Sequence, residues 1–265
     1  MYLPDRRTND QVPLIALHGF TGSGNDFLFL GDQINNPVYC PDITGHGRSS
    51  SPSGVEHYTA EALCNQLYEL TYLSGHRKIF LLGYSMGGRL ALSFALAHRN
   101  MIQGLILESS TPGLISPVER EQRKASDENL AGFIESSSPE TFTDYWMNIP
   151  LFSSQKNKLS KDTLNEIRAA KLKNSTTGLA NSLRGFSTGV MPPLWDKLHL
   201  IDFPMLLITG ALDEKYTGIA AKMIEHSGAG SYASHTIFEG CGHNVHLEDT
   251  AGFCSSVNKF LAEHG

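Results

Sequence analysis

Short apolar runs alternate with amphipathic segments over the first third of the chain. Four of these runs have the length and composition of buried strands: 13–18, 37–41, 79–82 and 102–107. Between them, 60–73 and 87–97 carry apolar residues at the spacing of a helix that buries one face. Strands that alternate with helices predict a mainly parallel sheet that is covered by helices on both faces.

The pattern changes after residue 111, where the signals of buried strands disappear. Polar, helical segments replace them: 118–129, 139–147, 160–172 and 178–186. Two strand signals and one helical pattern then follow, at 205–209, 236–238 and 250–263. We therefore predict an α/β core of residues 1–111 and 196–265, with residues 112–195 inserted as a helical cap. A separate helical domain that takes no part in the site is the alternative.

Composition and charge narrow the class of protein. The chain has 265 residues, is 40% hydrophobic and carries a net charge of −6 with both signs scattered, which fits one large α/β protein. It has no basic stripe for nucleic acid and no polybasic run for an anionic membrane. Met1–Gln11 lacks the apolar segment of an export signal, and no run approaches the roughly 20 apolar residues that span a bilayer. We expect a cytoplasmic protein, monomeric or a small homo-oligomer, that binds neither nucleic acid nor membrane.

The cysteines and histidines form no pattern that predicts a disulfide framework or a metal site. Cys40, Cys64, Cys241 and Cys254 show no CxxC pairing, which is typical of structural thiols in a reducing compartment. The chain has no HExxH motif and no His/Cys cluster with the spacing of metal ligands. We therefore expect no metal and no cofactor.

The strongest motif is Gly83-Tyr84-Ser85-Met86-Gly87, a G-x-S-x-G sequence between the strand signal 79–82 and the helical segment 87–97. In this strand–turn–helix context the motif predicts a nucleophile elbow, in which the serine has a strained backbone and its hydroxyl is exposed. The helix N-terminus beside it favours developing negative charge. Ser85 is the predicted reactive residue of an α/β-hydrolase fold.

A glycine-rich loop, His18-Gly19-Phe20-Thr21-Gly22-Ser23-Gly24, follows the first strand signal. It matches the loop that supplies one backbone N–H of an oxyanion hole, here from Phe20, while the residue after the nucleophile, Met86, supplies the other. A phosphate-binding loop is the alternative, but its lysine is absent and its spacing does not match.

Two further residues complete a predicted catalytic triad. Asp213 follows the strand signal at 205–209, and His243 follows the one at 236–238, so each lies at the carboxyl end of a strand. The chain order of serine, acid and histidine is that of the α/β-hydrolases. Either residue alone could belong to a surface turn, but the joint match in this order favours the triad.

Arg89 indicates an anionic substrate. It lies four residues after Ser85, one turn along the same helix and on the same face. A guanidinium beside the reactive serine can bind a carboxylate through two hydrogen bonds. An ion pair with a carboxylate of the cap is the alternative. The cap has further basic residues, each of which on its own is as consistent with a solvated helix face: Arg120, Arg123, Arg168, Lys171 and Arg184.

With these residues the chain resembles, over nearly its whole length, the family of 2-succinyl-6-hydroxy-2,4-cyclohexadiene-1-carboxylate synthases of menaquinone biosynthesis. The stretches that carry the resemblance are Pro41-Asp42-Ile43-Thr44-Gly45-His46-Gly47, the elbow with Gly88-Arg89, Thr111-Pro112-Gly113-Leu114, Glu119-Arg120-Glu121-Gln122-Arg123 with Ser126-Asp127, Trp146 ahead of Pro150-Leu151-Phe152, Gly178-Leu179-Ala180-Asn181-Ser182-Leu183-Arg184, and Gly242-His243-Asn244-Val245-His246. The combination of Arg89, the paired cap arginines and the G-H-N-x-H tail is the selective part.

The resemblance implies a carbon–oxygen lyase on the scaffold of a hydrolase. Ser85, assisted by His243 and Asp213, would abstract a ring proton from 2-succinyl-5-enolpyruvyl-6-hydroxy-3-cyclohexene-1-carboxylate, and pyruvate would be eliminated. The backbone amides of Phe20 and Met86 would stabilise the oxyanionic charge. The substrate implied is thus a small polycarboxylate.

The resemblance also implies a set of substrate-binding residues. Arg89 and Arg123 match arginines that bind carboxylates, and Tyr84 and Trp146 match residues of the pocket. A third basic position of the cap aligns with Arg168 or with Lys171, because the loop at 174–177 can be gapped in two ways. Arg184, at the end of the matching 178–184 segment, is included in the predicted set.

Two other functions remain open. A hydrolase of carboxylic esters or of carbon–carbon bonds would use Ser85 as a true nucleophile; Arg89 argues against it, because a neutral ester needs no buried cation. A binding module without catalysis is a third interpretation, and the complete serine–acid–histidine set argues against that one.

Overall fold

The computed structural model describes residues 11–73 and 75–265. The segment for which we expect no export signal, Met1–Gln11, lies outside the described residues except for Gln11. In the described part, one sheet of parallel strands has the order β2-β1-β3-β4-β5-β6. Its strands are β1 Leu14–Leu17, β2 Val38–Tyr39, β3 Ile79–Tyr84, β4 Ile102–Glu108, β5 Met205–Gly210 and β6 Ala233–Phe238. The predicted parallel α/β architecture is confirmed.

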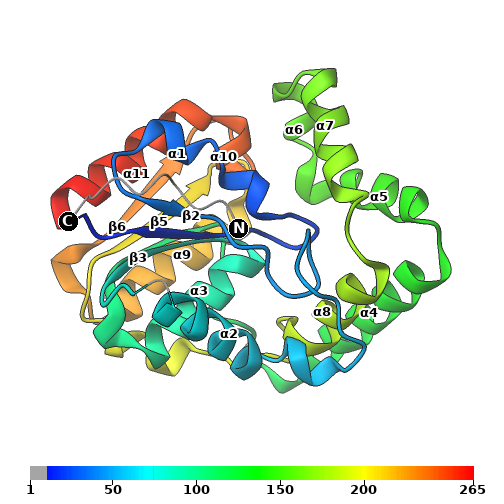
Figure 1. The fold of residues 1–265 in the computed structure, drawn as a ribbon, viewed down its shortest axis with the longest axis horizontal. Coiled ribbons are helices and arrows are strands. Elements are labelled where there is room, and N and C mark those ends of the chain that lie inside the picture. The colour runs from blue at the N-terminus through cyan, green and yellow to red at the C-terminus, as the bar shows by residue number, and fades with distance from the viewer. Residues whose placement is uncertain (1–10, 74) are drawn as a thin grey trace.

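Helices cover both faces of this sheet (Figure 1). One face carries α2 Ala60–Leu73, α3 Met86–Ala97 and α9 Glu214–His226. The other carries α1 Leu30–Gln33, α10 Val245–Glu248 and α11 Thr250–His264. Because the central strands are buried on both sides, they consist of nearly continuous apolar residues.

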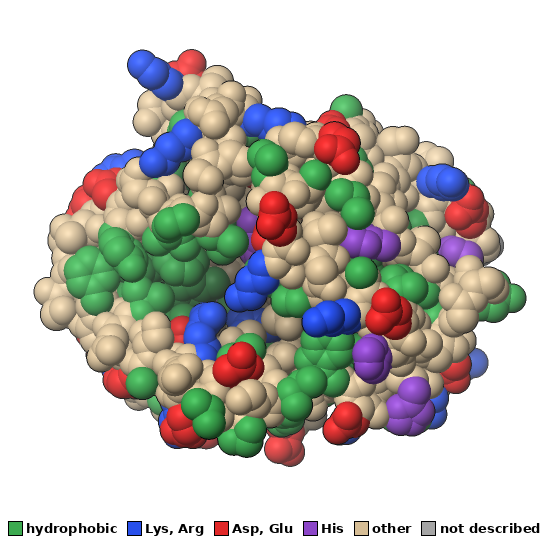
Figure 2. Space-filling model, turned by 180° about the vertical axis from the view of Figure 1, so that it is seen from behind, with side chains coloured by type: hydrophobic (Ala, Val, Ile, Leu, Met, Phe, Trp, Pro, Cys, Tyr) green, Lys and Arg blue, Asp and Glu red, His purple; other side chains and the backbone are tan. Residues whose placement is uncertain are grey.

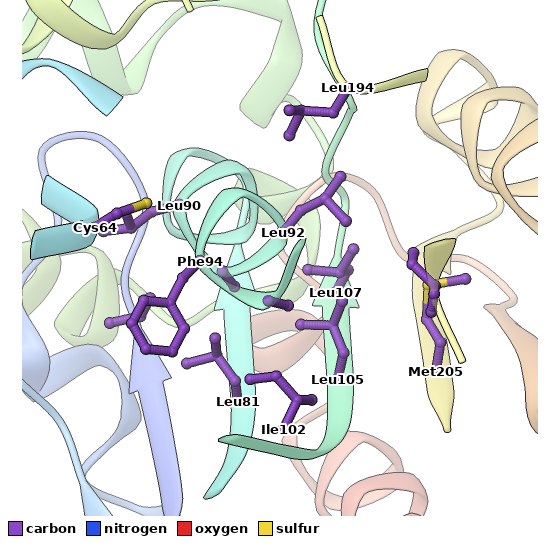
Figure 3. Close-up of a cluster of buried hydrophobic side chains, with 14 of the residues drawn as sticks. Cys64, Leu81, Leu90, Leu92, Phe94, Ile102, Leu105, Leu107, Leu194 and Met205 are labelled. Carbon is purple, nitrogen blue, oxygen red and sulfur yellow. The ribbon is translucent and has the colours of Figure 1, made fainter. Parts of the chain in front are cut away.

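The larger apolar core lies between the sheet and the first group of helices. Figure 3 shows part of it: Phe94 of α3 lies near Leu81 of β3, Leu92 of α3 lies near Leu107 of β4, and Leu90 of α3 lies beside Cys64 of α2. This packing holds α3 against β3, the strand that precedes it. It therefore also fixes the position of the turn between β3 and α3.

Helices also fill the segment between β4 and β5, and they lie to one side of the sheet (Figure 1). They are α4 Pro117–Ser136, α5 Pro139–Met147, α6 Gln155–Lys158, α7 Lys161–Lys171 and α8 Thr176–Phe186. Four of them begin directly after a serine whose side chain accepts a hydrogen bond from a backbone N–H of the first turn: Ser116, Ser138, Ser160 and Ser175. The division into a core and a cap at residues 112 and 195 stays a prediction.

Short 3₁₀ segments connect the larger elements: Gly24–Phe27, Val55–Tyr58, Arg99–Met101, Pro150–Phe152, Trp195–Leu200 and Gly230–Tyr232. No described helix is both long enough and apolar enough to cross a membrane.

Some elements differ from the sequence-based expectation. Helix α4 continues seven residues past the predicted end at 129, because Ala131 and Ile134 pack against α5 and α8 in a small apolar core. We predicted no helix for the segment of α9. Of the side chains of α9 only Ala220 and Met223 are buried, so this helix carries few of the apolar residues that mark a buried helical face in a sequence.

Candidate active site

Ser85 lies at the turn between β3 and α3, in a left-handed backbone conformation that side chains rarely adopt. Its φ is 51° and its ψ is −106°. The glycines two positions away make this turn possible: a Cβ at Gly83 would collide with the carbonyl of Gly87, and one at Gly87 with the carbonyl of Leu17. The elbow therefore presents the hydroxyl of Ser85 at the N-terminus of α3.

His243 lies beside this hydroxyl, and Asp213 lies on the other side of the imidazole. Nε2 of His243 is 3.1 Å from Oγ of Ser85, and its Nδ1 is 2.6 Å from Oδ2 of Asp213. Because the carboxylate can only accept, Nδ1 carries the proton and Nε2 is left free to accept one from Ser85. Asp213 and His243 are buried. The structure brings together three residues that are far apart in the sequence, and the arrangement can activate the serine hydroxyl as a base or as a nucleophile.

The two backbone N–H groups predicted for the oxyanion hole, those of Phe20 and Met86, have no hydrogen-bond acceptor in the described part of the chain. The loop that carries Phe20 is held from behind by the buried imidazole of His18. Nδ1 of His18 donates to the carbonyl of Gly19 at 2.8 Å, and Nε2 accepts from the backbone N–H of Ile43 at 3.0 Å. Burial lowers the pKa of His18, so it is neutral and can play both roles at once.

A cavity of about 290 Å³, here called the serine cavity, opens beside the triad. Its polar side is formed by side chains of α3, α4 and α8 and of the segment after α8, among them Arg89, Arg123, Ser182, Ser187 and Thr188. Its apolar side is formed by Phe20, Leu130, Trp146, Ile149, Leu151 and Phe152. Figure 2 shows a hollow on this side of the molecule, where hydrophobic side chains line one wall and lysine or arginine side chains lie next to them.

Arg89 extends from α3 into the serine cavity and forms no ion pair with any described residue. Its guanidinium lies over the ring of Phe186, 5.3 Å from the centroid. Burial lowers the pKa of Arg89 to about 10, so the group keeps its charge at neutral pH. The alternative of an ion pair with a cap carboxylate is therefore not what the structure shows. Arg123 differs, because its Nε donates to Asp127 at 2.7 Å on the same helix.

Tyr84 and Trp146, both predicted for the pocket, line the serine cavity. The ring of Tyr84 lies 5.4 Å from that of His243, and the ring of Trp146 lies 5.1 Å from that of Phe20 at nearly a right angle. The indole N–H of Trp146 is buried and has no partner among the described residues. It is therefore a donor available to a substrate.

A second cavity of about 350 Å³, here called the lysine cavity, shares the walls formed by Phe20, Tyr84 and Phe152 with the first. Lys171, at the end of α7, lines it, and its Nζ donates to Oγ1 of Thr21 at 2.8 Å. It has no carboxylate partner among the described residues. Burial lowers the pKa of Lys171, and Asp26 opposes that effect in part. Lys171 is half-buried and carries the one positive charge among the described residues that line this cavity, which also include Asp26 and Glu166, so it is the group there that can bind an anion.

Two polar side chains of the lysine cavity also lack partners. Nε2 of Gln155 and Oδ1 of Asn244 are buried and have no hydrogen-bond partner in the described part of the chain. Such atoms are rare in folded proteins, and at the wall of a cavity they are free to bind a polar ligand.

The structure corrects the predicted placement of two basic residues. Arg168 of α7 forms two hydrogen bonds with the exposed carboxylate of Asp144, which belongs to α5. Arg184 binds Glu128 and Glu135 of α4 on the surface. Neither lines the serine cavity or the lysine cavity. Both bind carboxylates of the protein itself, and of the two candidates for the third cap cation only Lys171 reaches a cavity.

Several residues of the serine cavity were not predicted from the sequence, and Tyr216 is the one that contacts the triad histidine. Tyr216, in the first turn of α9, lines the serine cavity and contacts the ring of His243. Glu108 and His246 form a fully buried pair behind Tyr84. The available signal for Tyr216 was its position three residues after Asp213, since that carboxylate caps the helix that begins there.

Comparison with known proteins agrees with this geometry. A family model described as the alpha/beta hydrolase fold matches residues 12–250. The chain is 40% identical over 261 residues to the Bacillus subtilis (strain 168) protein named "Putative 2-succinyl-6-hydroxy-2,4-cyclohexadiene-1-carboxylate synthase", with 97% of this chain and 93% of that one covered. It is 32% identical to the Citrobacter koseri protein named 2-succinyl-6-hydroxy-2,4-cyclohexadiene-1-carboxylate synthase, with 94% and 93% covered.

Solved structures show the same relationship. MenH from S. aureus superposes with a TM-score of 0.93 at 30% identity, covering 99% of this chain and 98% of that one. A thermophilic esterase from Thermogutta terrifontis superposes with a TM-score of 0.81 at 24% identity, over 96% and 91% of the two chains, and so shares the fold.

Proposed function

Because the chain belongs to the family of 2-succinyl-6-hydroxy-2,4-cyclohexadiene-1-carboxylate synthases within the α/β-hydrolase fold, we propose that it is a pyruvate-eliminating lyase of menaquinone biosynthesis. The proposed substrate is 2-succinyl-5-enolpyruvyl-6-hydroxy-3-cyclohexene-1-carboxylate. The observation that carries the proposal is Arg89: a charged guanidinium with no carboxylate partner among the described residues lies one helical turn from Ser85, in the cavity of the triad. A site for neutral esters has no use for such a group.

In the proposed mechanism Ser85 acts as a base. Its oxygen takes the proton from the ring carbon next to the succinyl ketone while its own proton moves to Nε2 of His243, and Asp213 stabilises the imidazolium that forms. The electron pair of the broken C–H bond shifts through the ring double bond and expels the enolpyruvyl oxygen. The imidazolium of His243 then gives up its proton, the leaving enolate takes up one proton and becomes pyruvate, and the triad returns to its starting state. No bond forms between Ser85 and the substrate.

Negative charge develops on the succinyl ketone oxygen during proton abstraction. The backbone N–H groups of Phe20 and Met86 are placed to donate to that oxygen, since neither has an acceptor in the described part of the chain. Donors fixed in advance stabilise the transition state without having to reorganise, which lowers the barrier to breaking the C–H bond.

The cations of the site match the carboxylates of the substrate. Arg89 and Arg123 line the serine cavity, and Lys171 lines the neighbouring lysine cavity. We assign carboxylate binding to all three. Lys171 then fills the third cationic position of the cap, for which the sequence left Arg168 and Lys171 as alternatives. Tyr84 and Trp146 contribute to the walls, and the indole N–H of Trp146 offers one more donor.

Three further expectations belong to this proposal. Residues 112–195 act as a cap that excludes water from the reacting centre, because α4, α5 and α8 carry walls of the serine cavity. The enzyme works in the cytoplasm, where a substrate with several carboxylates is retained. It needs neither metal nor cofactor, since its own groups supply base, relay and oxyanion donors.

The direct test is to identify the products made by the purified protein. Incubation with the proposed substrate should yield pyruvate and the conjugated diene in equal amounts, with pyruvate followed by a coupled dehydrogenase assay and the diene by its ultraviolet absorbance. Disappearance of the substrate without pyruvate, or no turnover at all, would refute the proposal.

Ester hydrolysis is the second candidate, and one observation favours it. The wall formed by Leu130, Ile149 and Leu151 is apolar and fits a hydrophobic acyl chain. A nitrophenyl ester separates the two functions, because a hydrolase with Ser85 as nucleophile would show a pre-steady-state burst and a turnover that rivals good esterases.

A further inference from the structure

Tyr216 is the third residue of α9, and its side chain reaches the serine cavity. Its backbone N–H donates to Oδ1 of Asp213 at 3.4 Å, while Oδ2 of the same carboxylate accepts from His243. The acid of the triad thus holds the start of α9 as well as the imidazole. This connection places the phenol beside the reacting groups.

The ring of Tyr216 makes an edge contact with the imidazole of His243. The two centroids are 4.6 Å apart, with an interplanar angle of 61°. Tyr84 lies against the same imidazole at 5.4 Å, so His243 is enclosed by two aromatic rings. This packing accounts for an aromatic ring at position 216. It does not account for the hydroxyl, because phenylalanine would make the same contact.

The hydroxyl of Tyr216 has no hydrogen-bond partner among the described residues. Two guanidinium groups, of Arg89 and Arg123, line the same cavity. Burial raises the pKa of Tyr216, and the two positive charges oppose that effect, so the phenol keeps its proton at neutral pH and is a donor.

The serine cavity therefore presents donors without enough acceptors. Of its lining residues, Asp127 is the one carboxylate, and it already accepts from Nε of Arg123. A neutral hydroxyl beside unpaired guanidinium nitrogens is the combination that binds a carboxylate, whose two oxygens accept several hydrogen bonds at once.

We propose that Tyr216 is a specificity-determining residue: its hydroxyl donates a hydrogen bond to the substrate carboxylate that Arg89 binds, while the edge of its ring holds His243 in place. The identity of the substrate rests on the proposed function, but the contact with a carboxylate does not. A neutral compound in this position leaves both the phenol and the guanidinium without an acceptor, which disfavours it. Tyr216 thus selects anionic substrates together with Arg89.

Tyr216→Phe is the decisive variant, because it removes the hydroxyl and keeps the ring. Tyr232→Phe is the matched control, since that tyrosine is exposed and its ring lies near His264, outside the lining of both cavities. For each protein we would measure KM and kcat of pyruvate release, the affinity for succinate as a simple dicarboxylate by calorimetric titration, and the thermal midpoint.

For Tyr216→Phe we expect KM to rise and succinate affinity to fall, each by about tenfold, as for the loss of one hydrogen bond to a charged group. The change in kcat should be smaller, and the thermal midpoint should stay that of the wild type. Tyr232→Phe should match the wild type throughout.

The inference is overturned if Tyr216→Phe keeps the wild-type KM and succinate affinity, or if kcat falls with KM unchanged, which would show an effect through His243 alone. Wild-type protein that releases no pyruvate would refute the proposed function instead. In that case the succinate titration still decides: weaker binding by Tyr216→Phe supports the inference, whereas equal affinity, or no binding to the wild type, overturns it.

Discussion

The carbonyl oxygen of Glu108 accepts a hydrogen bond from the backbone N–H of Ser85 at 2.9 Å. The carboxylate of the same Glu108 accepts from the backbone N–H of His246 at 3.0 Å and from its Nδ1 at 2.8 Å. His246 follows His243 by three residues. One glutamate at the end of β4 therefore connects the segment that carries the base of the reaction with the segment that carries its histidine.

Replacing Glu108 should impair both stability and catalysis. Glu108→Ala leaves two donors of His246 buried without an acceptor, which should lower the free energy of unfolding by about 3 kcal/mol. It should also lower kcat, because the histidine segment loses its anchor. Glu108→Gln keeps one acceptor and should have a smaller effect on both. Urea unfolding and the rate of pyruvate release measure these effects, with Glu69→Ala on the exposed face of α2 as the control. Wild-type stability of Glu108→Ala would contradict this account.

Arg89 and Arg123 should differ in how strongly each affects the reaction. Arg89→Ala should lower kcat/KM by about 10- to 100-fold, and Arg89→Lys should restore little, because an ammonium cannot replace the planar guanidinium. Arg123→Ala should mainly raise KM, since Asp127 already holds part of its guanidinium. Arg99→Ala, which breaks exposed contacts with Asp202 and with the carbonyl of Leu200, serves as the control. Unchanged kcat/KM in both Arg89→Ala and Arg123→Ala would show that the cavity does not recognise anions through them.

Lys171 and Arg168 provide a test within one helix. Lys171→Met should raise KM and at the same time stabilise the fold by about 1 kcal/mol, because it removes a half-buried cation that has no carboxylate partner among the described residues. Arg168→Ala should change neither by much, since its partner Asp144 is exposed. Steady-state kinetics and thermal unfolding provide the two readouts. The opposite order of effects would assign the third cationic position to Arg168.

Stability should fall in acid because of His46. This histidine is buried beside His18 and Phe20, and burial lowers its pKa from 6.5 to about 3. The unfolded chain therefore binds a proton that the folded chain does not, so the stabilising contribution is complete above pH 6.5 and is lost as the pH falls toward 3. His46→Asn should reduce the slope of unfolding free energy against pH by about 1.4 kcal/mol per pH unit in this window. A variant at the exposed His57 should keep the wild-type slope. A wild-type slope in His46→Asn would instead show that the imidazole of His46 is protonated in the folded protein, which would contradict this account.

The sheet and the elbow could be predicted because their signals are local. The apolar run at Ile79–Leu82 and the glycines around Ser85 are dictated by burial and by backbone geometry within a few residues. Asp213 and His243 could be located because each directly follows a strand, and the carboxyl ends of parallel strands share one edge.

Contacts made across elements could not be predicted in the same way. Arg168 and Lys171 lie on one helix, and which of them faces a cavity depends on how α7 packs against the loop of Thr21. Arg184 binds the carboxylates of a neighbouring helix, which its own sequence segment does not reveal. The sequence around His246 gives no local signal that its side chain is buried. Its burial follows from Glu108, a residue 138 positions away in the chain.

The most direct test of the central claim compares the initial rate of pyruvate release by the wild type and by Ser85→Ala under saturating substrate. If Ser85 is the base of a triad with His243 and Asp213, the wild type should release pyruvate steadily and Ser85→Ala should lose at least about a thousandfold in kcat, while substrate binding persists. Pyruvate release by Ser85→Ala at a rate near that of the wild type would contradict the account.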